Sequence, residues 1–326
     1  MKVLFVFSGN SSLFPISPFT KSQGESLREK GVDVEYFPVV GKGLNYLKNV
    51  GPLRKRLQEC SPDLIHAHYS LCGWVAVLAA GKTPVVLSLM GDDAQGTFTG
   101  NGKVDLKSRF FIFLTWLIQP FLRAIIFKSP NLEKAVYRKK AAHLVPNGVR
   151  LDQFEVSEKG YREELGLAPD KQYVLFLGNP EDLNKNAALA REAVRLLARP
   201  GVELLEVFGV SHQKVVQYLN SVDVFVLCSF GEGSPNVVKE AMTCNCPLVV
   251  TPAGDAEWVV GDTEGCYVAS YDPADFSKKL ESALAFAATR KRTKGRDRIV
   301  ALGLDAGSVA SKILSIYHKV ITPKNK

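Results

Sequence analysis

The stretch FGEGSPNVVKEAM, residues 230–242, does most to decide what this chain is. Ser234 is a favoured N-cap residue and Pro235 a favoured first helical residue, so the stretch predicts a loop that runs into a helix. The backbone N–H groups of Asn236 and Val237 would then have no partners within the helix. A helix start of this kind binds phosphate through its free donors and the positive end of its dipole.

Two carboxylates flank this predicted phosphate site. Glu232 lies just before the helix, and Glu240 lies inside it on about the same face as Asn236. Apolar sequence follows Glu240, so its carboxylate should be buried and should need hydrogen-bond partners. Gly231 and Gly233 let a ligand approach the backbone closely. The set suits a ligand with diols next to its phosphates, as in a sugar nucleotide; the alternative is a capped amphipathic helix with a solvated Glu240.

Composition restricts the class of protein and its partners. The chain has 326 residues, enough for two domains, and is 46% hydrophobic and 23% charged, as expected of a globular protein. Its net charge of +8 indicates anionic partners such as nucleotide phosphates, acidic glycans or a lipid surface. Nucleic acid is not expected, because the basic residues are not interleaved with aromatic residues along one element.

The cysteines and the first residues of the chain indicate the cellular compartment of the protein. Six cysteines stand mostly in apolar runs, so they are expected to be small core residues of a protein in a reducing compartment. Residues 3–7 form a short apolar run, typical of a first strand and too short for a signal peptide. We therefore expect a cytoplasmic protein. Peripheral binding to the inner face of the plasma membrane is an alternative, which the apolar segment at residues 110–127 suggests.

The segment FFIFLTWLIQPFLRAIIF, residues 110–127, is almost entirely apolar. Its length approaches that of a membrane span, but Gln119, Pro120 and Arg123 would each be costly in hydrocarbon. The favoured prediction is a helix up to Gln119 that buries one face, followed by a short helix and a strand. Basic residues border the segment, so it could also lie in the plane of an anionic bilayer; they are Lys103, Lys107, Arg109, Arg123 and Lys128.

Strand-like and helix-like runs alternate through both halves of the chain, which predicts α/β domains with parallel sheets. The turn-rich residues 145–154 mark the junction. We expect two Rossmann-like, doubly wound domains that face each other across a cleft, where open α/β sheets bind ligands. The predicted parts are a first domain at 1–150, a second domain at 151–305, and a helix within 306–326.

Taken in order, several motifs resemble those of one known family. Residues 232–240 resemble the E-x7-E element of the retaining glycosyltransferases of family 4, which have the GT-B fold. The likeness is strong over residues 145–285 and weaker over 1–145. The other motifs that carry it are PNGV at 146–149 with Asp152 and Phe154, SVDVFV at 221–226, PLVVTPAG at 247–254, and FLGN at 176–179 with Lys185 and Asn186.

The resemblance implies that residues 1–150 form the acceptor-side domain, that residues 151–305 form the nucleotide-sugar-binding domain, and that the helix at 306–326 returns to the first domain. It also implies a role for each matching residue. Glu240 would hold the ribose hydroxyls of the donor, Glu232 would hold hydroxyls of the transferred sugar, and Lys185 would neutralise the diphosphate. Gly178 would leave room for the diphosphate, and Gly9 would approach it or the acceptor from the first domain. The phosphate end would be lined by Gly233, Ser234, Asn236 and Val237.

Some positions depart from the family pattern. Asn179 stands where the family has an arginine beside the lysine, and a lysine alone cannot form a bidentate fork. His68 is a candidate catalytic group at a strand end, with a structural hydrogen-bonding role as the alternative. Asp92 is a candidate substrate contact. The pair Asp92 and Asp93 raises a metal site as an alternative, but one adjacent pair is a weak signal, so no metal is expected.

The resemblance thus implies an enzyme that transfers a hexosyl or N-acetylhexosaminyl group with retention. Its donor would be a UDP- or GDP-sugar, no further cofactor would be needed, and the acceptor would be a glycan or a lipid-linked glycan used in cell-surface synthesis. Two alternatives remain open at this point. One is a nucleotide-sugar epimerase on the same fold, and the other is a non-catalytic relative that binds nucleotide sugars or glycans.

Overall fold

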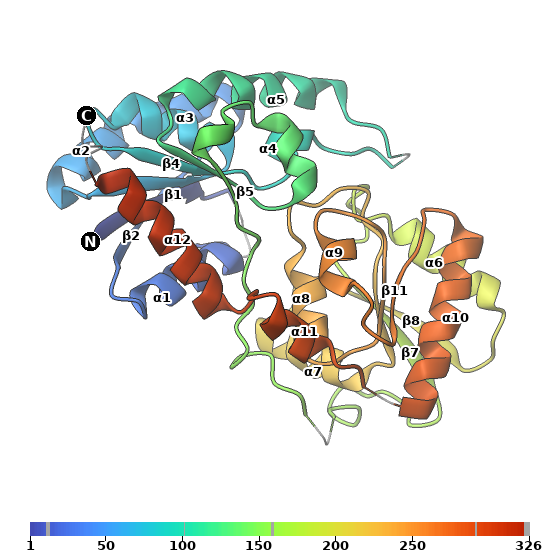
Figure 1. The fold of residues 1–326 in the computed structure, drawn as a ribbon. Coiled ribbons are helices and arrows are strands. Elements are labelled where there is room, and N and C mark those ends of the chain that lie inside the picture. The colour runs from blue at the N-terminus through green and yellow to red at the C-terminus, as the bar shows by residue number, and fades with distance from the viewer. Residues whose placement is uncertain (11–13, 101, 158–159, 291, 323–326) are drawn as a thin grey trace. The chain divides into compact units, whose positions relative to one another are not determined.

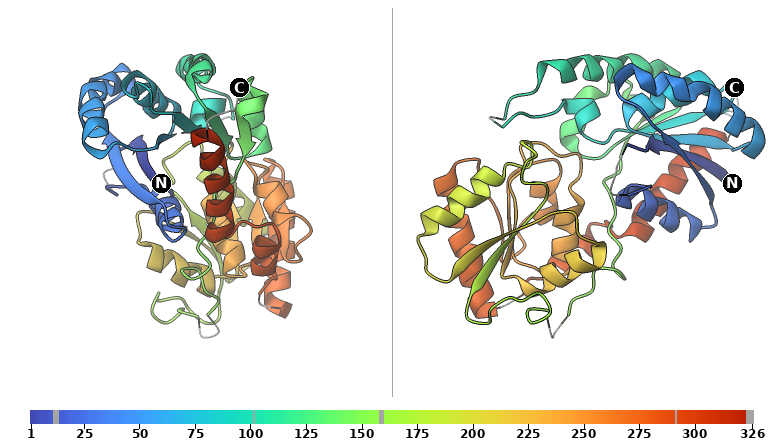
Figure 2. Two further views of the ribbon diagram at one scale, coloured as in Figure 1. Left: turned by 60° about the vertical axis from the view of Figure 1, so that its left-hand side comes forward. Right: turned by 180° about the vertical axis from the view of Figure 1, so that it is seen from behind.

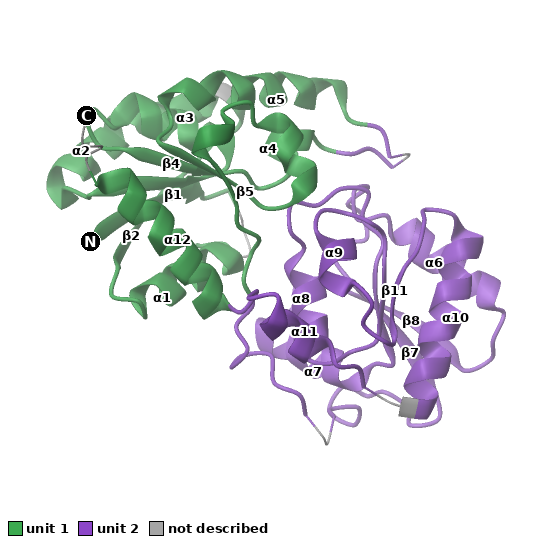
Figure 3. Cartoon of the chain, viewed as in Figure 1, with its two compact units in different colours: residues 1–97, 104–148, 306–326 green, residues 98–103, 149–305 purple. Residues whose placement is uncertain are grey.

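The chain forms two α/β units, each with its own sheet and core (Figures 1 and 3). This agrees with the predicted class of two Rossmann-like domains. Unit 1 comprises residues 1–97, 104–148 and 306–326, and unit 2 comprises residues 98–103 and 149–305. The computed structural model describes residues 1–10, 14–100, 102–157, 160–290 and 292–322.

Unit 1 is built on a parallel sheet whose six described strands have the order β2-β1-β3-β4-β5-β6. The chain goes outward from β1 to β2 and then continues on the other side of β1, so the switch point lies between β1 and β3. The strands are β1 Lys2–Ser8, β2 Asp33–Val39, β3 Leu64–His68, β4 Val85–Ser88, β5 Ala124–Phe127 and β6 Ala142–Leu144. The helices are α1 Pro18–Arg28, α2 Val50–Cys60, α3 Ser70–Ala79, α4 Asp92–Gln95, α5 Leu106–Ile118 and α12 Ala306–Ile321, with 3-10 turns η1 Gly43–Asn49, η2 Gln119–Phe121, η3 Pro130–Ala135 and η4 Lys139–Ala141.

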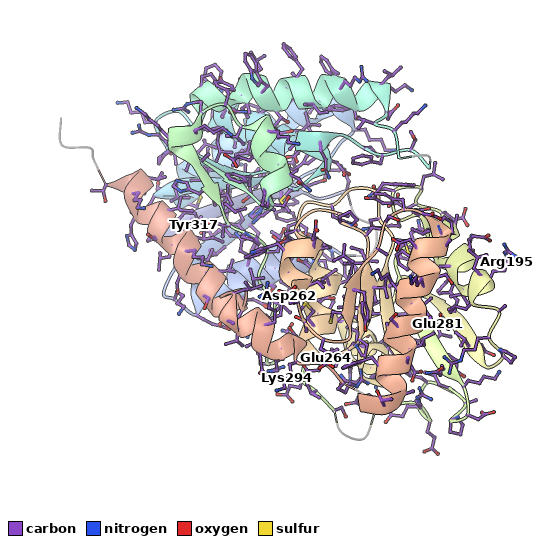
Figure 4. The ribbon with its side chains drawn as sticks, turned by 45° about the vertical axis from the view of Figure 1, so that its right-hand side comes forward. Arg195, Asp262, Glu264, Glu281, Lys294 and Tyr317 are labelled. Atoms are coloured by element: carbon purple, nitrogen blue, oxygen red, sulfur yellow. The ribbon has the colours of Figure 1, made fainter. Side chains whose placement is uncertain are left out.

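Alternation along β1 divides the core of unit 1 into two layers. Leu4 and Val6 face the layer under α2 and α3, whereas Val3 and Phe5 face the layer that includes α12. Both layers are fully buried, as a parallel sheet covered on both faces requires. Helix α12 contributes Tyr317, labelled in Figure 4, whose hydroxyl is 2.5 Å from Nδ1 of His66. The last helix of the chain is therefore part of the same core as its first strand.

Unit 2 repeats this design. Its five described strands have the order β11-β10-β9-β7-β8 and are all parallel, so its switch point lies between β7 and β9. The strands are β7 Gln172–Leu177, β8 Val202–Val207, β9 Val224–Leu227, β10 Leu248–Val250 and β11 Cys266–Val268. The helices are α6 Ala187–Leu197, α7 His212–Ser221, α8 Asn236–Thr243, α9 Ala256–Val260, α10 Pro273–Arg290 and α11 Gly295–Ala301.

The long apolar segment forms helix α5, the turn η2 and strand β5, close to the prediction. The helix ends one residue before Gln119, because Pro120 cannot continue it. Its buried face is narrow. Phe111 packs against the core, whereas the other aromatic side chains of α5 point outward: Phe113 is 53% exposed and Trp116 is 50% exposed. No helix in the described part of the chain is long and apolar enough to cross a membrane.

Candidate functional site

The switch point of unit 2 brings two loops together at the carboxyl ends of its strands. The loop after β7 starts at Gly178 and carries Lys185 to the start of α6. The loop after β9 carries Glu232 to the start of α8. The residues that the sequence singled out in this half of the chain therefore come from adjacent strands of one sheet.

Lys185 and Glu232 form an ion pair at this edge. Lys185 Nζ lies 2.6 Å from Glu232 Oε1, and the two side chains are 31% and 16% exposed. The pair is partly screened by solvent, so it contributes little to stability. The pair matters because it places a cation and a carboxylate together in the loops that follow β7 and β9, where both side chains remain partly exposed.

Asn184 holds these two loops in register, and the sequence analysis missed it. Its side-chain amide donates to the carbonyl of Gly231, 2.9 Å away, and accepts from the N–H of the same residue, 3.1 Å away. Its own carbonyl accepts from the N–H of Phe230. The neighbouring Lys185 is thereby fixed opposite Glu232. An asparagine directly before the predicted phosphate-binding lysine was the only signal available in the sequence.

Helix α8 begins at Asn236, with Pro235 as the N-cap residue, so the prediction of Ser234 as the N-cap is wrong. The Ser234 hydroxyl donates to Asp255 Oδ2, 2.7 Å away, and accepts from Lys239 Nζ, 2.6 Å away. Hydrogen bonds to charged groups are about twice as strong as a neutral bond to a backbone amide, so the charged partners take the hydroxyl.

Lys239 and Asp255 form a fully buried ion pair that the sequence analysis did not identify. Lys239 Nζ lies 2.9 Å from Asp255 Oδ2 and 3.2 Å from Oδ1, and neither side chain is exposed. With Ser234 they tie the loop before α8 to the loop after β10. Two adjacent charged residues, Lys239 and Glu240, in an otherwise apolar helix were a detectable signal, because a buried charge requires a partner.

Glu240 is the second charged residue of that helix and remains without a direct partner. It is 8% exposed, and no described residue donates a hydrogen bond to its carboxylate. Burial raises the pKa of Glu240 to about 7, although the neighbouring charge of Lys239 acts in the opposite direction. A carboxyl group that titrates near neutrality can donate or accept hydrogen bonds, which suits a pair of ligand hydroxyls.

Between the end of β9 and the first residue of α8, two other polar groups also lack partners in the described part of the chain. They are the buried Oδ1 atom of Asn236 and the buried hydroxyl of Ser229. Val237 packs against the core, which leaves only its N–H group for a ligand. Gly233 is buried in the loop before the helix. Buried polar groups in folded proteins usually have a protein, water or ligand partner, so these two can hydrogen-bond to water or to a ligand.

Two residues of the loop after β7 that were predicted to contact the donor, Gly178 and Asn179, have local structural roles. Asn179 Oδ1 accepts from the N–H of Glu181, and its carbonyl accepts from Asp182, so Asn179 forms the turn that starts the loop. Gly178 continues the sheet by donating to Val207. A Cβ atom on Gly178 would come no closer than 3.5 Å to Lys185 Cγ, so this glycine is not required by packing within the chain.

Gly254 is needed for the geometry of the Glu232 loop. It has a φ of +65°, and a Cβ atom would lie 2.9 Å from the carbonyl oxygen of Glu232. We expect Gly254→Ala to lower the free energy of unfolding by more than ~2 kcal/mol, since it combines left-handed strain with a backbone clash. Gly201 has a φ of +79° with no atom within 4 Å, so Gly201→Ala should cost only about 1 kcal/mol. Equal losses in urea unfolding would contradict this account.

In unit 1 the corresponding switch point carries Gly9 and the end of β3. Gly9 donates to the carbonyl of Val39, and a Cβ atom there would lie 2.8 Å from Pro38 Cβ. Packing against β2 therefore explains this glycine without any ligand. The strained residue is Tyr69, whose φ is +85° directly after β3. Strain of this kind, of about 1–3 kcal/mol, concentrates at functional sites.

His68 lies at the end of β3 and is 2% exposed. Its ring stacks on His66 with a centroid distance of 4.3 Å, and no described group bonds to either ring nitrogen. Burial, with the positive charge of Lys128, lowers the pKa of His68 to about 3. Its imidazole is therefore neutral at physiological pH. His66 has the structural role, since it bonds to Tyr317 and Ser88.

Asp92 and Asp93 have different environments. Asp92 is exposed, whereas Asp93 is fully buried and accepts from the N–H groups of Ser70, Met90 and Gly91. Burial raises the pKa of Asp93 to about 6. Asp93 thus fastens the start of α3 to α4. Among the described residues no group of three or more His, Cys, Asp or Glu side chains is placed to hold a metal ion.

Two parallel-sheet α/β units in one chain, each with a topological switch point of the kind that binds ligands, are the features of the GT-B class. The family model for "Glycosyltransferase Family 4" matches residues 15–153, and that for "Glycosyl transferases group 1" matches residues 170–285. These matches fall on both parts of the chain in which the sequence motifs were found. The chain belongs to the family 4 glycosyltransferases, as the motifs predicted.

Individual relatives agree with this assignment. The chain is 26% identical over 276 residues to D-inositol 3-phosphate glycosyltransferase 2 of Catenulispora acidiphila; the match covers 68% of this chain and 62% of that protein. The chain thus spans less than two thirds of that relative's length. Sucrose-phosphate synthase of Thermosynechococcus elongatus has a similar fold, with a TM-score of 0.79, 18% identity and 98% of each chain covered. Anabaena HepE, solved with UDP and glucose, gives a TM-score of 0.73 with 16% identity over 98% of this chain and 100% of that one.

Proposed function

We propose that this protein transfers a hexosyl or N-acetylhexosaminyl group from a UDP- or GDP-sugar to a hydroxyl acceptor, with retention of configuration. The observation that carries the proposal is the Lys185–Glu232 pair at the loop before α8, together with the buried carboxylate of Glu240 inside that helix. Diphosphate, sugar and ribose each have a chemically matched group in this set. The solved relative with UDP and glucose supports a nucleotide-sugar donor.

Donor binding would rearrange the ion pair between Lys185 and Glu232. Lys185 would exchange Glu232 for the donor diphosphate, and Glu232 would then accept hydrogen bonds from hydroxyls of the sugar. Glu240 would accept from the ribose diol, replacing the solvation that burial removed. Each group thus gains a partner that it lacks or holds only weakly in the ligand-free chain. Gly178 and Gly233 would allow the diphosphate to approach the backbone.

In the proposed reaction the bond between the anomeric carbon and the donor phosphate breaks, and the acceptor oxygen bonds to the same face of that carbon. The acceptor proton passes to the leaving phosphate. Negative charge grows on the diphosphate in the transition state, where Lys185 and the N–H groups of Asn236 and Val237 would stabilise it. This arrangement supplies positive charge without a metal ion. His68, being neutral and buried, would orient the acceptor side rather than carry a proton.

The proposed setting is synthesis of a cell-surface polysaccharide or a lipid-linked oligosaccharide, at the cytoplasmic face of a membrane. Helix α5 supports it, because its outward side chains form a stripe at helical spacing: Leu106, Phe110, Phe113 and Leu117, extended by Phe121. A helix with an exposed apolar stripe and basic borders can lie in the interface of an anionic bilayer. We refer to these five residues as the α5 stripe.

Removal of Lys185 tests the reaction directly. We expect Lys185→Ala to lower kcat by about 100-fold or more, the effect of losing one preorganised group that stabilises transition-state charge. Lys171→Ala is the matched control, since Lys171 forms an ion pair with Glu203 on the surface of the same unit. A panel of UDP- and GDP-sugars would first be ranked by the thermal stabilisation each gives the protein.

The same panel of nucleotide sugars distinguishes sugar transfer from the two alternative functions, epimerisation and binding without catalysis. Donor isomerised without any acceptor would identify an epimerase, and donor binding without turnover on any acceptor would identify a non-catalytic relative. Full activity of Lys185→Ala would refute the assigned role of Lys185.

A further inference from the structure

A broad groove lies in unit 1 at the amino ends of strands β5 and β6. It has a volume of about 1400 Å³ and is bounded by Arg123, residues 137–143 and the last turn of α12. Figure 2 shows this end of α12 beside the segment that leads into β6. Open α/β sheets bind their substrates at the carboxyl ends of the strands, so this groove is at the opposite edge from the expected acceptor site.

The lining of the groove is strongly basic. Arg123, Arg138, Lys139, Lys140 and Lys319 contribute fixed positive charge, and among the described lining residues none carries a carboxylate. One carboxylate acts nearby, because Glu133 pairs with Lys139 at 3.1 Å. A concave surface lined by one sign of charge concentrates counter-ions, so the groove is suited to an anion.

Two histidines stand among these lysines and arginines. His143 comes from β6 and His318 from α12, and both line the groove. Burial, and then the charge of Lys319, lowers the pKa of His143. Cations from two elements far apart in the sequence therefore converge on one space. Cations at the end of α12 also compensate its own helix dipole, but that accounts for none of the basic residues between 123 and 140.

The groove lies next to exposed apolar side chains of α5 and η2. The ring of Tyr137, which lines the groove, packs against Trp116 of α5 with a centroid distance of 4.8 Å. Arg123 comes two residues after Phe121, the stripe residue at the end of η2, which is 59% exposed. A soluble anion would gain nothing from an exposed apolar surface beside its site. A lipid offers the two chemistries together, a phosphate group and hydrocarbon.

We propose that this basic groove binds the phosphate headgroups of anionic phospholipids while the α5 stripe enters the adjacent hydrocarbon. The inference deepens the proposed membrane association and rests on it. It assigns the groove an anchoring role separate from donor binding in unit 2. The cations would set the preference for anionic over neutral lipid, and the stripe would supply binding to both.

Vesicle co-sedimentation of the full chain tests this assignment, with phosphatidylcholine alone and with phosphatidylcholine containing phosphatidylglycerol. The groove variant is Lys140→Glu with Lys319→Glu, both at exposed positions. The control is Lys30→Glu with Lys55→Glu, the same charge change at exposed residues that do not line the groove. We expect the groove variant to lose about tenfold or more in affinity for anionic vesicles, and the control less than about threefold, since charges near the lipid surface dominate.

The outcomes separate the parts of the proposal. Equal losses in the groove variant and its control, or no loss in the groove variant, would overturn the groove assignment. If inorganic phosphate at low millimolar concentration displaces the protein from anionic vesicles, the groove is a site for soluble anions and the lipid assignment is wrong. Phe110→Ser with Phe113→Ser should weaken binding to both kinds of vesicle; if only this variant loses binding, the stripe stands and the groove does not. Thermal stabilisation by donor, measured on the same variants, reports independently on sugar transfer.

Discussion

Replacing Glu240 with glutamine is expected to raise the free energy of unfolding by about 3 kcal/mol at pH 8 and to weaken donor binding. The folded protein holds the pKa of Glu240 at about 7, against an ordinary value of 4.5. Ionising this carboxyl in the folded state therefore carries a penalty of about 1.4 kcal/mol for each unit of the shift. Glutamine has nearly the same shape and cannot ionise, so it removes that penalty.

The direction of the pH dependence follows from proton counts. Between pH 4.5 and 7 the folded state binds more protons at Glu240 than the unfolded state does, so stability conferred by this residue falls as pH rises through that window. At pH 4 both states are protonated, and Glu240→Gln should match the original protein. At pH 8 the full difference should be present.

Urea unfolding at pH 4 and pH 8 measures this difference. Glu281→Gln is the control, because Glu281 is exposed on α10 (Figure 4) and should show no such dependence. Calorimetric titration with the best donor should show a loss of about tenfold or more for Glu240→Gln, since hydrogen bonds to a charged acceptor are exchanged for neutral ones. A variant that is less stable at pH 8, or that binds donor normally, would refute the assignment of Glu240. Stability gained at the expense of function is common at binding sites.

Breaking the buried pair of Lys239 and Asp255 is expected to produce the largest loss of stability. Either Lys239→Met or Asp255→Leu would leave one charge buried without its partner, at a cost of about 3–5 kcal/mol. Both side chains are fully buried, so solvent cannot compensate. Because the pair joins the loop before α8 to the loop after β10, donor binding should fall as well.

The double variant, Lys239→Met with Asp255→Leu, distinguishes lost charge pairing from lost packing. It leaves no unpaired charge, so it should recover most of the stability, since hydrophobic replacement of a buried pair is often neutral. Denaturant unfolding of the four proteins gives the coupling energy. Losses that simply add would show that the two residues act independently. Asp223→Leu is a comparison, because its ion pair with Arg162 is partly exposed and should matter less.

The family and the alternating α/β order could be predicted from short motifs, because each depends on local sequence. Lys185 and Glu232 were both found from their motifs, although 47 residues separate them. Their contact could not be predicted, since it depends on the Asn184 side chain bridging two loops. The role of Ser234 was mistaken for the same reason. A local rule predicts a cap, but Asp255, 21 residues further on, offers a stronger partner.

The segment at residues 110–127 shows a different limit. It is apolar on every side of the helix, so periodicity could not indicate which face would be buried. The structure leaves Phe110 and Phe113 outward and buries Thr115 and Ile118 instead. His68 was equally ambiguous, and only the packing of Phe5 and Phe19 around it shows that its ring is neutral and enclosed.

The sequence by itself determined the two parallel-sheet domains, the family, and the loop and helix that carry Glu232 and Glu240. These follow from periodicity, turn chemistry and helix-start preferences, which act over a few residues. Tertiary structure alone decided the pairing of Lys239 with Asp255, the bridge made by Asn184, the protonation of Glu240 and the exposure of the α5 stripe. Burial and partner choice depend on residues that are distant in the chain, and they set the energy of every charged group in the site.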